Sequence, residues 1–285
     1  INPTINAATD ITTTTSTDGT GNCSVAVVIT NAAFGDNCTG STITWAMTGA
    51  VTATGNGQVG TYTFPIGTTT ITYTVTDGAS RTATDSMTVT VTDNENPTIT
   101  CPTNLTANTS DDGTGNCSTA VNVPTPSFND NCSATLTWST TGATNMSGSG
   151  GVGSRIFNIG TTTINYTVTD GAGLTANCSQ TVTVTDDESP TIGCPGNQNV
   201  AYDNNCEFTL QDYTSLATFS DNCGSGVTIT QSPNPGAVLS GAVTVTLTAT
   251  DSFNNTDICT FDVIPSDNID PVAVAQPITV NLAPN

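Results

Sequence analysis

Hydrophobic and polar residues alternate along much of this chain. The segment 70–76 is a clear case, because Ile71, Tyr73 and Val75 are separated by single threonines. Successive side chains of a β-strand point to opposite faces, so strict alternation predicts a strand with one buried face. No segment keeps the apolar period of 3.6 residues that is typical of an amphipathic helix. The pattern therefore predicts an all-β fold, and the many β-branched Thr, Val and Ile residues favour the same structure.

The alternating segments belong to a unit that returns along the chain. Residues 88–102 read Thr-Val-Thr-Val-Thr-Asp-Asn-Glu-Asn-Pro-Thr-Ile-Thr-Cys-Pro, and a close copy occupies 181–195. Looser copies lie at 267–275 and at the start of the chain, and the prolines that mark them are 94, 93 and 81 residues apart. A strand, an acidic turn, a proline and a second strand that recur in this order are typical of tandem modules. The predicted modules span 1–93, 94–186, 187–267 and, for the start of a fourth, 268–285.

The second module contains six or seven short strands with Asp, Asn and Gly turns between them, the first module follows the same pattern, and the third is a shorter version. This pattern predicts an immunoglobulin-like β-sandwich. We expect the aromatic residues at the centre of the strands to pack in the cores, with Ile229 of the third module in the place of Trp and Leu247 in the place of Tyr. The aromatic residues concerned are Trp45, Tyr73, Trp138 and Tyr166.

Ten cysteines in short modules indicate disulfides and an oxidising compartment. The second and third modules carry four each, whereas the first keeps only the middle two. Because the first and fourth cysteines are both missing from the first module, we infer that they bond to each other in the other modules. This reasoning predicts outer pairs and inner pairs. The outer pairs are Cys101–Cys178 and Cys194–Cys259, and the inner pairs are Cys23–Cys38, Cys117–Cys132 and Cys206–Cys223. Without a Cys-x-x-Cys or a histidine, a zinc site is disfavoured.

The charge balance excludes several functions. The formal net charge is -21, with Arg81 and Arg155 as the two cations and no Lys or His. A basic face for nucleic acid is therefore absent, and docking on an anionic membrane is disfavoured. The chain contains no apolar run of 18 residues, so its sequence predicts no membrane-spanning segment. Without His as a general base or Lys as an amine nucleophile, we expect no enzyme activity.

Acidic residues gather at the module junctions and at the last turn of each module. Carboxylates and amides are the ligands that Ca²⁺ prefers, so these groups are candidate calcium ligands that would cancel repulsion between modules. Solvated turn residues are the open alternative. The candidates are Asp77, Asp93, Glu95, Asp170, Asp186, Asp187, Glu188, Asp251, Asp267 and Asp270.

A second acidic set precedes one cysteine of each module. Asp36, Asp130 and Asp221 are each followed by Asn and Cys. Side chains of this type commonly accept hydrogen bonds from the backbone two residues on. We expect them to form turns of this kind and do not assign them to a metal.

Several segments resemble the hyalin repeat, or HYR, family of immunoglobulin-like extracellular modules. They are Asn-Pro-Thr-Ile-Thr-Cys-Pro at 96–102, Phe-Asn-Asp-Asn-Cys at 128–132, the run 157–170 and the run 175–186. The resemblance covers the second module fully, the third well and the first without its outer cysteines. It implies tandem, adhesion-related modules of secreted or surface proteins.

The expected function is a structural or adhesive repeat region of an extracellular fibre, stalk or surface adhesin, either a mature form or a piece of a longer protein. Its expected partners are neighbouring modules or further copies of the chain. Two alternatives stay open: modules that bind a glycan or a protein through their loops, and a filament subunit that polymerises by adding residues 271–285 as a strand to the next subunit.

Overall fold

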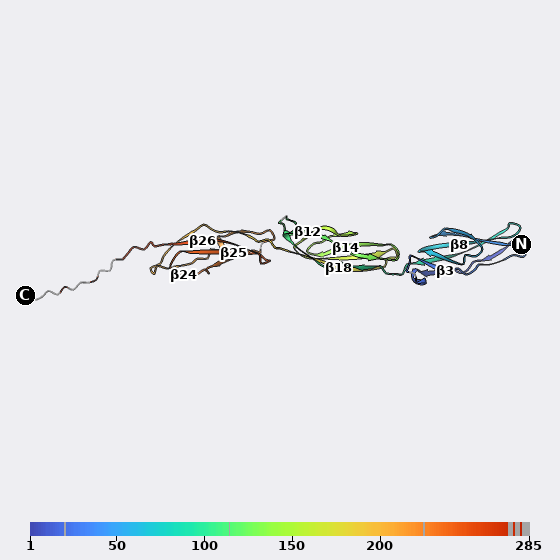
Figure 1. Cartoon of the computed structure of the whole chain (residues 1–285), viewed down its shortest axis with the longest axis horizontal. Coiled ribbons are helices and arrows are strands. Elements are labelled where there is room, and N and C mark those ends of the chain that lie inside the picture. The colour runs from blue at the N-terminus through green and yellow to red at the C-terminus, as the bar shows by residue number, and fades with distance from the viewer. Residues whose placement is uncertain (20, 114, 225, 273–275, 277–279, 281–285) are drawn as a thin grey trace, which may run out of the picture. The chain divides into compact units, whose positions relative to one another are not determined.

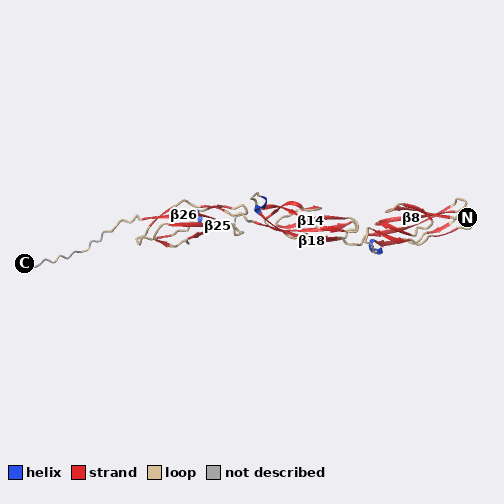
Figure 2. Ribbon diagram, in the orientation of Figure 1, coloured by secondary structure: helices blue, strands red, loops and turns tan. Residues whose placement is uncertain are grey.

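The computed structural model describes residues 1–285 except 20, 114, 225, 273–275, 277–279 and 281–285. The described residues form strands and three short 3₁₀ turns, drawn red and blue in Figure 2. The 3₁₀ turns are η1 (Thr15–Asp18), η2 (Thr109–Asp112) and η3 (Thr214–Leu216). The chain falls into two compact units, one of residues 1–106 and 120–183 and the other of residues 107–119 and 184–285. The predicted all-β fold is confirmed, and no described helix is long and apolar enough to cross a bilayer.

We call residues 1–93, 94–186 and 187–267 repeats one, two and three. Repeat one has a five-stranded sheet in the order β2-β9-β8-β5-β6 and two strand pairs, β1 with β4 and β3 with β7. The strands are β1 (Thr4–Asn6), β2 (Ile11–Thr14), β3 (Ser24–Val28), β4 (Ala33–Gly35), β5 (Thr42–Gly49), β6 (Ala53–Asn56), β7 (Thr61–Pro65), β8 (Gly67–Thr76) and β9 (Thr82–Thr92).

Repeat two has the same topology, with the sheet β11-β18-β17-β14-β15 and the pairs β10 with β13 and β12 with β16. Figure 1 labels β12, β14 and β18 of this repeat. Its strands are β10 (Thr98–Thr100), β11 (Leu105–Asn108), β12 (Ser118–Val123), β13 (Ser127–Asn129), β14 (Ala134–Gly142), β15 (Ser147–Ser149), β16 (Gly153–Asn158), β17 (Gly160–Asp170) and β18 (Thr175–Thr185).

Repeat three has a four-stranded sheet, β20-β26-β25-β23, and the pairs β19 with β22 and β21 with β24. Its strands are β19 (Thr191–Gly193), β20 (Gln198–Ala201), β21 (Phe208–Thr209), β22 (Thr218–Ser220), β23 (Thr228–Ser232), β24 (Val238–Leu239), β25 (Val243–Thr250) and β26 (Thr256–Ser266). Residues 268–272, 276 and 280 contain no strand, and the rest of the strand predicted at 268–285 lies outside the described residues.

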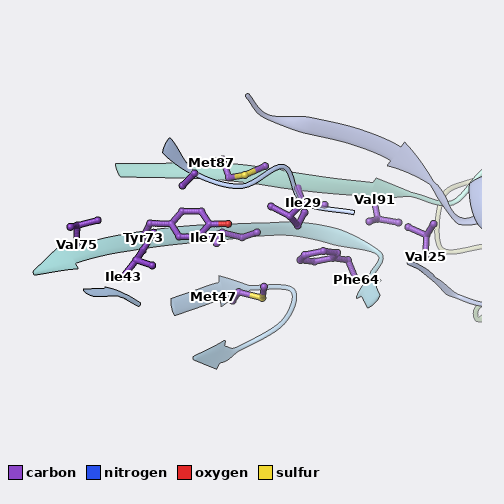
Figure 3. Close-up of a cluster of buried hydrophobic side chains, with 12 residues drawn as sticks. Val25, Ile29, Ile43, Met47, Phe64, Ile71, Tyr73, Val75, Met87 and Val91 are labelled. Atoms are coloured by element: carbon purple, nitrogen blue, oxygen red, sulfur yellow. The ribbon is translucent and has the colours of Figure 1, made fainter. Parts of the chain in front are cut away.

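The alternating pattern fills the core of each sandwich. Along β8, Ile71, Tyr73 and Val75 are fully buried while the threonines between them are half-buried. In Figure 3 they lie with Met47, Met87 and the other buried side chains of repeat one. The register places Trp45 opposite Tyr73 and Trp138 opposite Tyr166. Tyr73, Trp138 and Tyr166 are buried as expected, and Trp45 is half-buried against the core.

Repeat three fills the position of the tryptophan differently from our expectation. Leu247 does take the place of the tyrosine, but the residue opposite it is Gln231, and Ile229 lies opposite Ala249. The buried Gln231 side chain accepts a hydrogen bond from the Tyr213 backbone N–H at 2.8 Å and donates one to the Gln211 carbonyl at 2.9 Å. A polar anchor for the loop before β22 therefore replaces the indole ring.

Candidate metal centres

Three aspartates meet where β9, β13 and β17 end in the first unit. Asp93 follows β9, Asp130 follows β13 and Asp170 is the last residue of β17. One carboxylate oxygen of each lies within 4.8 Å of the others. Asp93 and Asp170 are 9% and 7% exposed, and Asp130 is half-buried. We call this group the first aspartate cluster.

Each carboxylate of the first cluster is held by one oxygen and leaves the other free. Asp93 Oδ1 accepts the Thr15 hydroxyl at 3.0 Å, and Asp130 Oδ2 accepts the Cys132 N–H at 3.1 Å. Asp170 Oδ1 accepts the N–H groups of residues 172 and 174 at 2.9 and 2.8 Å. The opposite oxygens, Asp93 Oδ2, Asp130 Oδ1 and Asp170 Oδ2, are buried without a hydrogen-bond partner among the described residues.

A second aspartate cluster repeats this arrangement in the second unit. Asp186 follows β18, Asp221 follows β22 and Asp251 follows β25, and their oxygens again lie within 4.8 Å of one another. Asp186 Oδ1 accepts the Thr109 hydroxyl at 3.0 Å, and Asp221 Oδ2 accepts the Cys223 N–H at 3.1 Å. Asp186 Oδ2 and Asp221 Oδ1 are buried without a partner within the described part of the chain.

The third carboxylate of the second cluster differs in one contact. Asp251 Oδ1 accepts two backbone N–H groups at 2.8 Å, but Oδ2 also accepts the Asn255 side-chain amide at 2.8 Å. Burial works against the charge of Asp251, yet the hydrogen bonds from Asn255 and Phe253 outweigh it and lower the pKa of this carboxyl. The aspartate therefore stays ionised beside its two neighbours.

The donor set of both clusters fits a hard divalent cation. Each cluster holds two buried and one half-buried carboxylate, and at least two of their oxygens have no partner among the described residues. Like charges this close are unfavourable unless a cation neutralises them. Ca²⁺ takes oxygen ligands at roughly 2.3–2.6 Å, so two oxygens on one ion lie at most about 5 Å apart. The separations within 4.8 Å meet this limit. In the first cluster Asn131 Oδ1 is a further buried oxygen without a donor among the described residues.

Four of the predicted ligands belong to the clusters and six lie outside them. The four are Asp93, Asp170, Asp186 and Asp251. Glu95 accepts a hydrogen bond from the Asn131 side-chain amide, and Glu188 accepts one from the Asn222 side-chain amide. Asp187 Oδ2 accepts the Ser110 hydroxyl at 2.6 Å, and this hydrogen bond lowers the pKa of Asp187. Asp267 and Asp270 are exposed.

The remaining predicted ligand, Asp77, has a cation of its own. Its Oδ2 pairs with Arg81 Nε at 2.8 Å, the one ion pair among the described residues. Its Oδ1 accepts the backbone N–H groups of Ala79 and Arg81, each at 2.8 Å. Hydrogen bonds from Arg81, first from its backbone N–H, hold the pKa of Asp77 below its ordinary value.

Sequence reasoning missed Asp130 and Asp221 as candidate ligands. Both form the expected turn, because one oxygen accepts the N–H of the cysteine two residues on. The second oxygen of each nevertheless enters a cluster. The signal available in the sequence was the recurrence of Asp-Asn-Cys in all three repeats. Asp36 has the same turn and a buried, unpartnered Oδ1, but it belongs to no cluster of described residues.

The cysteines adopt both predicted outer pairs but none of the predicted inner pairs. Cys101–Cys178 and Cys194–Cys259 are disulfides. Instead of Cys23–Cys38 and Cys117–Cys132, the structure contains Cys23–Cys132, with a Cα–Cα distance of 4.8 Å. Cys206 and Cys223, the third predicted inner pair, are not bonded to each other.

The inner prediction was wrong because the two cysteines of one repeat lie at opposite ends of its sandwich. Cys23 precedes Ser24, which pairs with Pro65 beside the start of β8. Cys38 precedes Thr42, which pairs with Thr76 at the other end of β8. At about 3.3 Å per residue the length of β8 separates them by roughly 30 Å, far beyond the reach of a disulfide.

Comparison with known proteins found one matching family and several similar solved structures. The HYR domain family matches residues 92–184 and 185–264. Among solved structures, the extracellular cadherin domains 1–5 of protocadherin gamma B2 align with 94% of this chain and 60% of their own at 14% identity and a TM-score of 0.35. Drosophila N-cadherin EC1-4 aligns with 93% of this chain and 75% of its own, at 12% identity and a TM-score of 0.37. Mouse cadherin-23 EC22-24 aligns with 93% of this chain and 99% of its own, at 14% identity and a TM-score of 0.34.

The family match covers more than half of the chain, in two consecutive segments. The structure supplies the β-sandwich topology in both segments, with their outer disulfides in place. HYR domains are adhesion-type repeat modules of extracellular proteins, and this chain belongs to the HYR domain family.

Proposed function

We propose that the chain is a structural and adhesive repeat region of an extracellular fibre, stalk or surface adhesin, in which Ca²⁺ binds at both aspartate clusters. The observation that carries the proposal is the repetition of the same three-carboxylate arrangement, with three buried, unpartnered oxygens in the first cluster and two in the second. A surface cluster of solvated turns would expose these oxygens to water instead. Family membership supports the extracellular setting, where Ca²⁺ is plentiful.

The clusters join segments that are far apart in sequence. Asp93 lies at the end of repeat one, whereas Asp130 and Asp170 lie at the ends of β13 and β17 in repeat two. Asp186 likewise meets two loops of repeat three. An ion bound to all three carboxylates ties the end of one repeat to the next one and removes the repulsion that resists this contact. The proposed partners are accordingly neighbouring repeats and other copies of the chain.

Calorimetric titration of the full chain, stripped with EDTA and titrated with Ca²⁺, tests the proposal. We expect two bound ions per chain. Asp130→Asn and Asp221→Asn should each remove one of them, because the amide keeps the shape of the side chain but supplies no charge.

Asp36→Asn is the matched control, since Asp36 has the same turn without a cluster of described residues. It should leave both ions in place. The proposal is wrong if the unaltered chain takes up no Ca²⁺, or if Asp36→Asn lowers the stoichiometry as much as the other two substitutions.

A further inference from the structure

The disulfide Cys23–Cys132 joins repeat one to repeat two beside the first aspartate cluster. Cys23 immediately precedes β3, and Cys132 lies two residues after the candidate ligand Asp130. The bond therefore links the same two repeats that the proposed ion links, but through a covalent contact that needs no metal.

The second unit contains the counterpart of each cysteine. Cys117 immediately precedes β12, as Cys23 precedes β3, and Cys223 lies two residues after Asp221. The Cys223 N–H bonds its aspartate at 3.1 Å, the same distance as in Cys132. Cys117 Sγ lies 2.6 Å from the carbonyl oxygen of Asn222, the residue directly before Cys223, and burial together with the nearby Cys117 thiol raises the pKa of Cys223. The Cys117 sulfur therefore lies against the backbone next to Cys223, and both cysteines are free thiols in the structure.

We propose that Cys117 and Cys223 form a second disulfide between repeats, so that the cysteine directly before the third strand of one repeat bonds to the Asp-Asn-Cys cysteine of the next repeat. The proposal goes beyond the calcium sites and does not depend on them, because the contact is carried by the two thiols and the backbone around them. The rule is already followed by Cys23–Cys132.

The bond requires a thiol–disulfide oxidant of the kind present in extracellular and periplasmic compartments. The thiolate of one cysteine attacks a sulfur of the oxidant, forms a mixed disulfide and releases one thiol. The thiolate of the other cysteine then attacks the protein sulfur of the mixed disulfide and releases the second thiol. Two electrons and two protons pass from the two cysteines to the oxidant, which leaves as two thiols.

The same rule gives complementary roles to Cys206 and Cys38, both exposed. Cys206 lies before β21, where Cys23 and Cys117 lie in their repeats, and lines a hollow with Asp267 and Asp270. Cys38 follows Asp36 and its buried, unpartnered oxygen, as Cys132 follows Asp130. Two copies placed head to tail would bring Cys206 of one copy to Cys38 of the other.

The first test is disulfide mapping of the full chain, oxidised with a glutathione couple in EDTA and digested without reduction. We expect a Cys117–Cys223 peptide and two thiols, Cys38 and Cys206, in the monomer. Four thiols after full oxidation would overturn the proposal. So would Cys117–Cys132 or Cys206–Cys223 peptides. Since EDTA removes Ca²⁺, this outcome is independent of the calcium proposal.

The second test uses the single variants Cys38→Ser and Cys206→Ser on non-reducing gels. Each variant alone should stay monomeric, because it lacks one partner of the head-to-tail bond. An equimolar mixture should give dimers and stop there, whereas the unaltered chain should give a ladder that thiol reduction collapses. Equal dimer formation by each variant alone, or none in the mixture, would overturn the head-to-tail pairing.

Discussion

Asp77, Asp170 and Asp251 occupy the same turn in the three repeats, but the partner of their Oδ2 atom differs. In each turn Oδ1 accepts two backbone N–H groups at 2.8–2.9 Å. The residue four positions on decides what meets Oδ2, and it is Arg81 in repeat one, Leu174 in repeat two and Asn255 in repeat three. A side-chain cation therefore neutralises the first turn, whereas the other two present their charge to a cluster.

This contrast predicts a pH effect that can be assigned to Asp77. Its folded pKa is lowered, so the carboxylate contributes stability above the unfolded pKa, about 3.9, and loses it as the pH falls through the lower folded pKa. Asp77→Asn should lower the thermal midpoint at pH 7, and its difference from the unaltered chain should shrink in acid. The measurement is a series of thermal unfolding curves from pH 7 to pH 2.

Arg81→Gln separates the causes of this pKa shift. The first cause is the Arg81 backbone N–H, which the substitution retains. The variant should therefore keep most of the acid dependence that Asp77→Asn removes. If Arg81→Gln abolished it as completely as Asp77→Asn does, the guanidinium and not the backbone would hold the carboxylate.

At the scale of strands, the alternating pattern was sufficient to find the elements. Ile71, Tyr73 and Val75 face the core because an extended chain has a period of two, and no tertiary knowledge is needed for that. The pairing register between neighbouring strands is harder to predict from the sequence. The expectation for Ile229 was two residues off, because only the pairing with β25 shows that Gln231 lies opposite Leu247.

Contacts between repeats were the part that the sequence could not supply. The outer disulfides close within one repeat, so their loss from repeat one revealed the pairing. Cys23 and Cys132 belong to different repeats, and the internal copies give no sign of which neighbour each one meets. Asp130 was missed for the same reason, since its turn is local whereas Asp93 comes from the preceding repeat.

The buried glutamine of β23 makes a prediction about repeat three. Gln231→Leu keeps an apolar stem but leaves the Tyr213 N–H and the Gln211 carbonyl without their partner. A buried backbone group left unsatisfied costs about 1–3 kcal/mol, so the variant should lose at least this much stability in denaturant unfolding. Gln211→Leu is the control, because that side chain is exposed and its carbonyl remains. Equal losses in both variants would refute the anchoring role.

At the scale of the whole molecule, the dominant feature is uncompensated charge. A formal net charge of -21 with two cations means that folded repeats are held together against their own repulsion. The aspartate clusters concentrate this repulsion where the repeats meet within each unit, because three carboxylates share a space less than 5 Å across. Disulfides oppose it mechanically, and a bound divalent ion would oppose it electrostatically.

The salt dependence of stability can separate the repulsion within the clusters from the repulsion over the rest of the surface. In EDTA, raising NaCl should raise the thermal midpoint, since the Debye length falls to about 10 Å at 0.1 M and screens the repulsion. In excess Ca²⁺ the midpoint should be higher at low salt and should depend less on NaCl, because the ions already neutralise the buried carboxylates. At a free Ca²⁺ concentration 100-fold above Kd, each site should add about 2.7 kcal/mol. Asp130→Asn with Asp221→Asn should lose the Ca²⁺ response but keep the response to NaCl. Identical salt slopes with and without Ca²⁺ would mean that the repulsion arises over the surface and that the clusters play no special part in holding the repeats together.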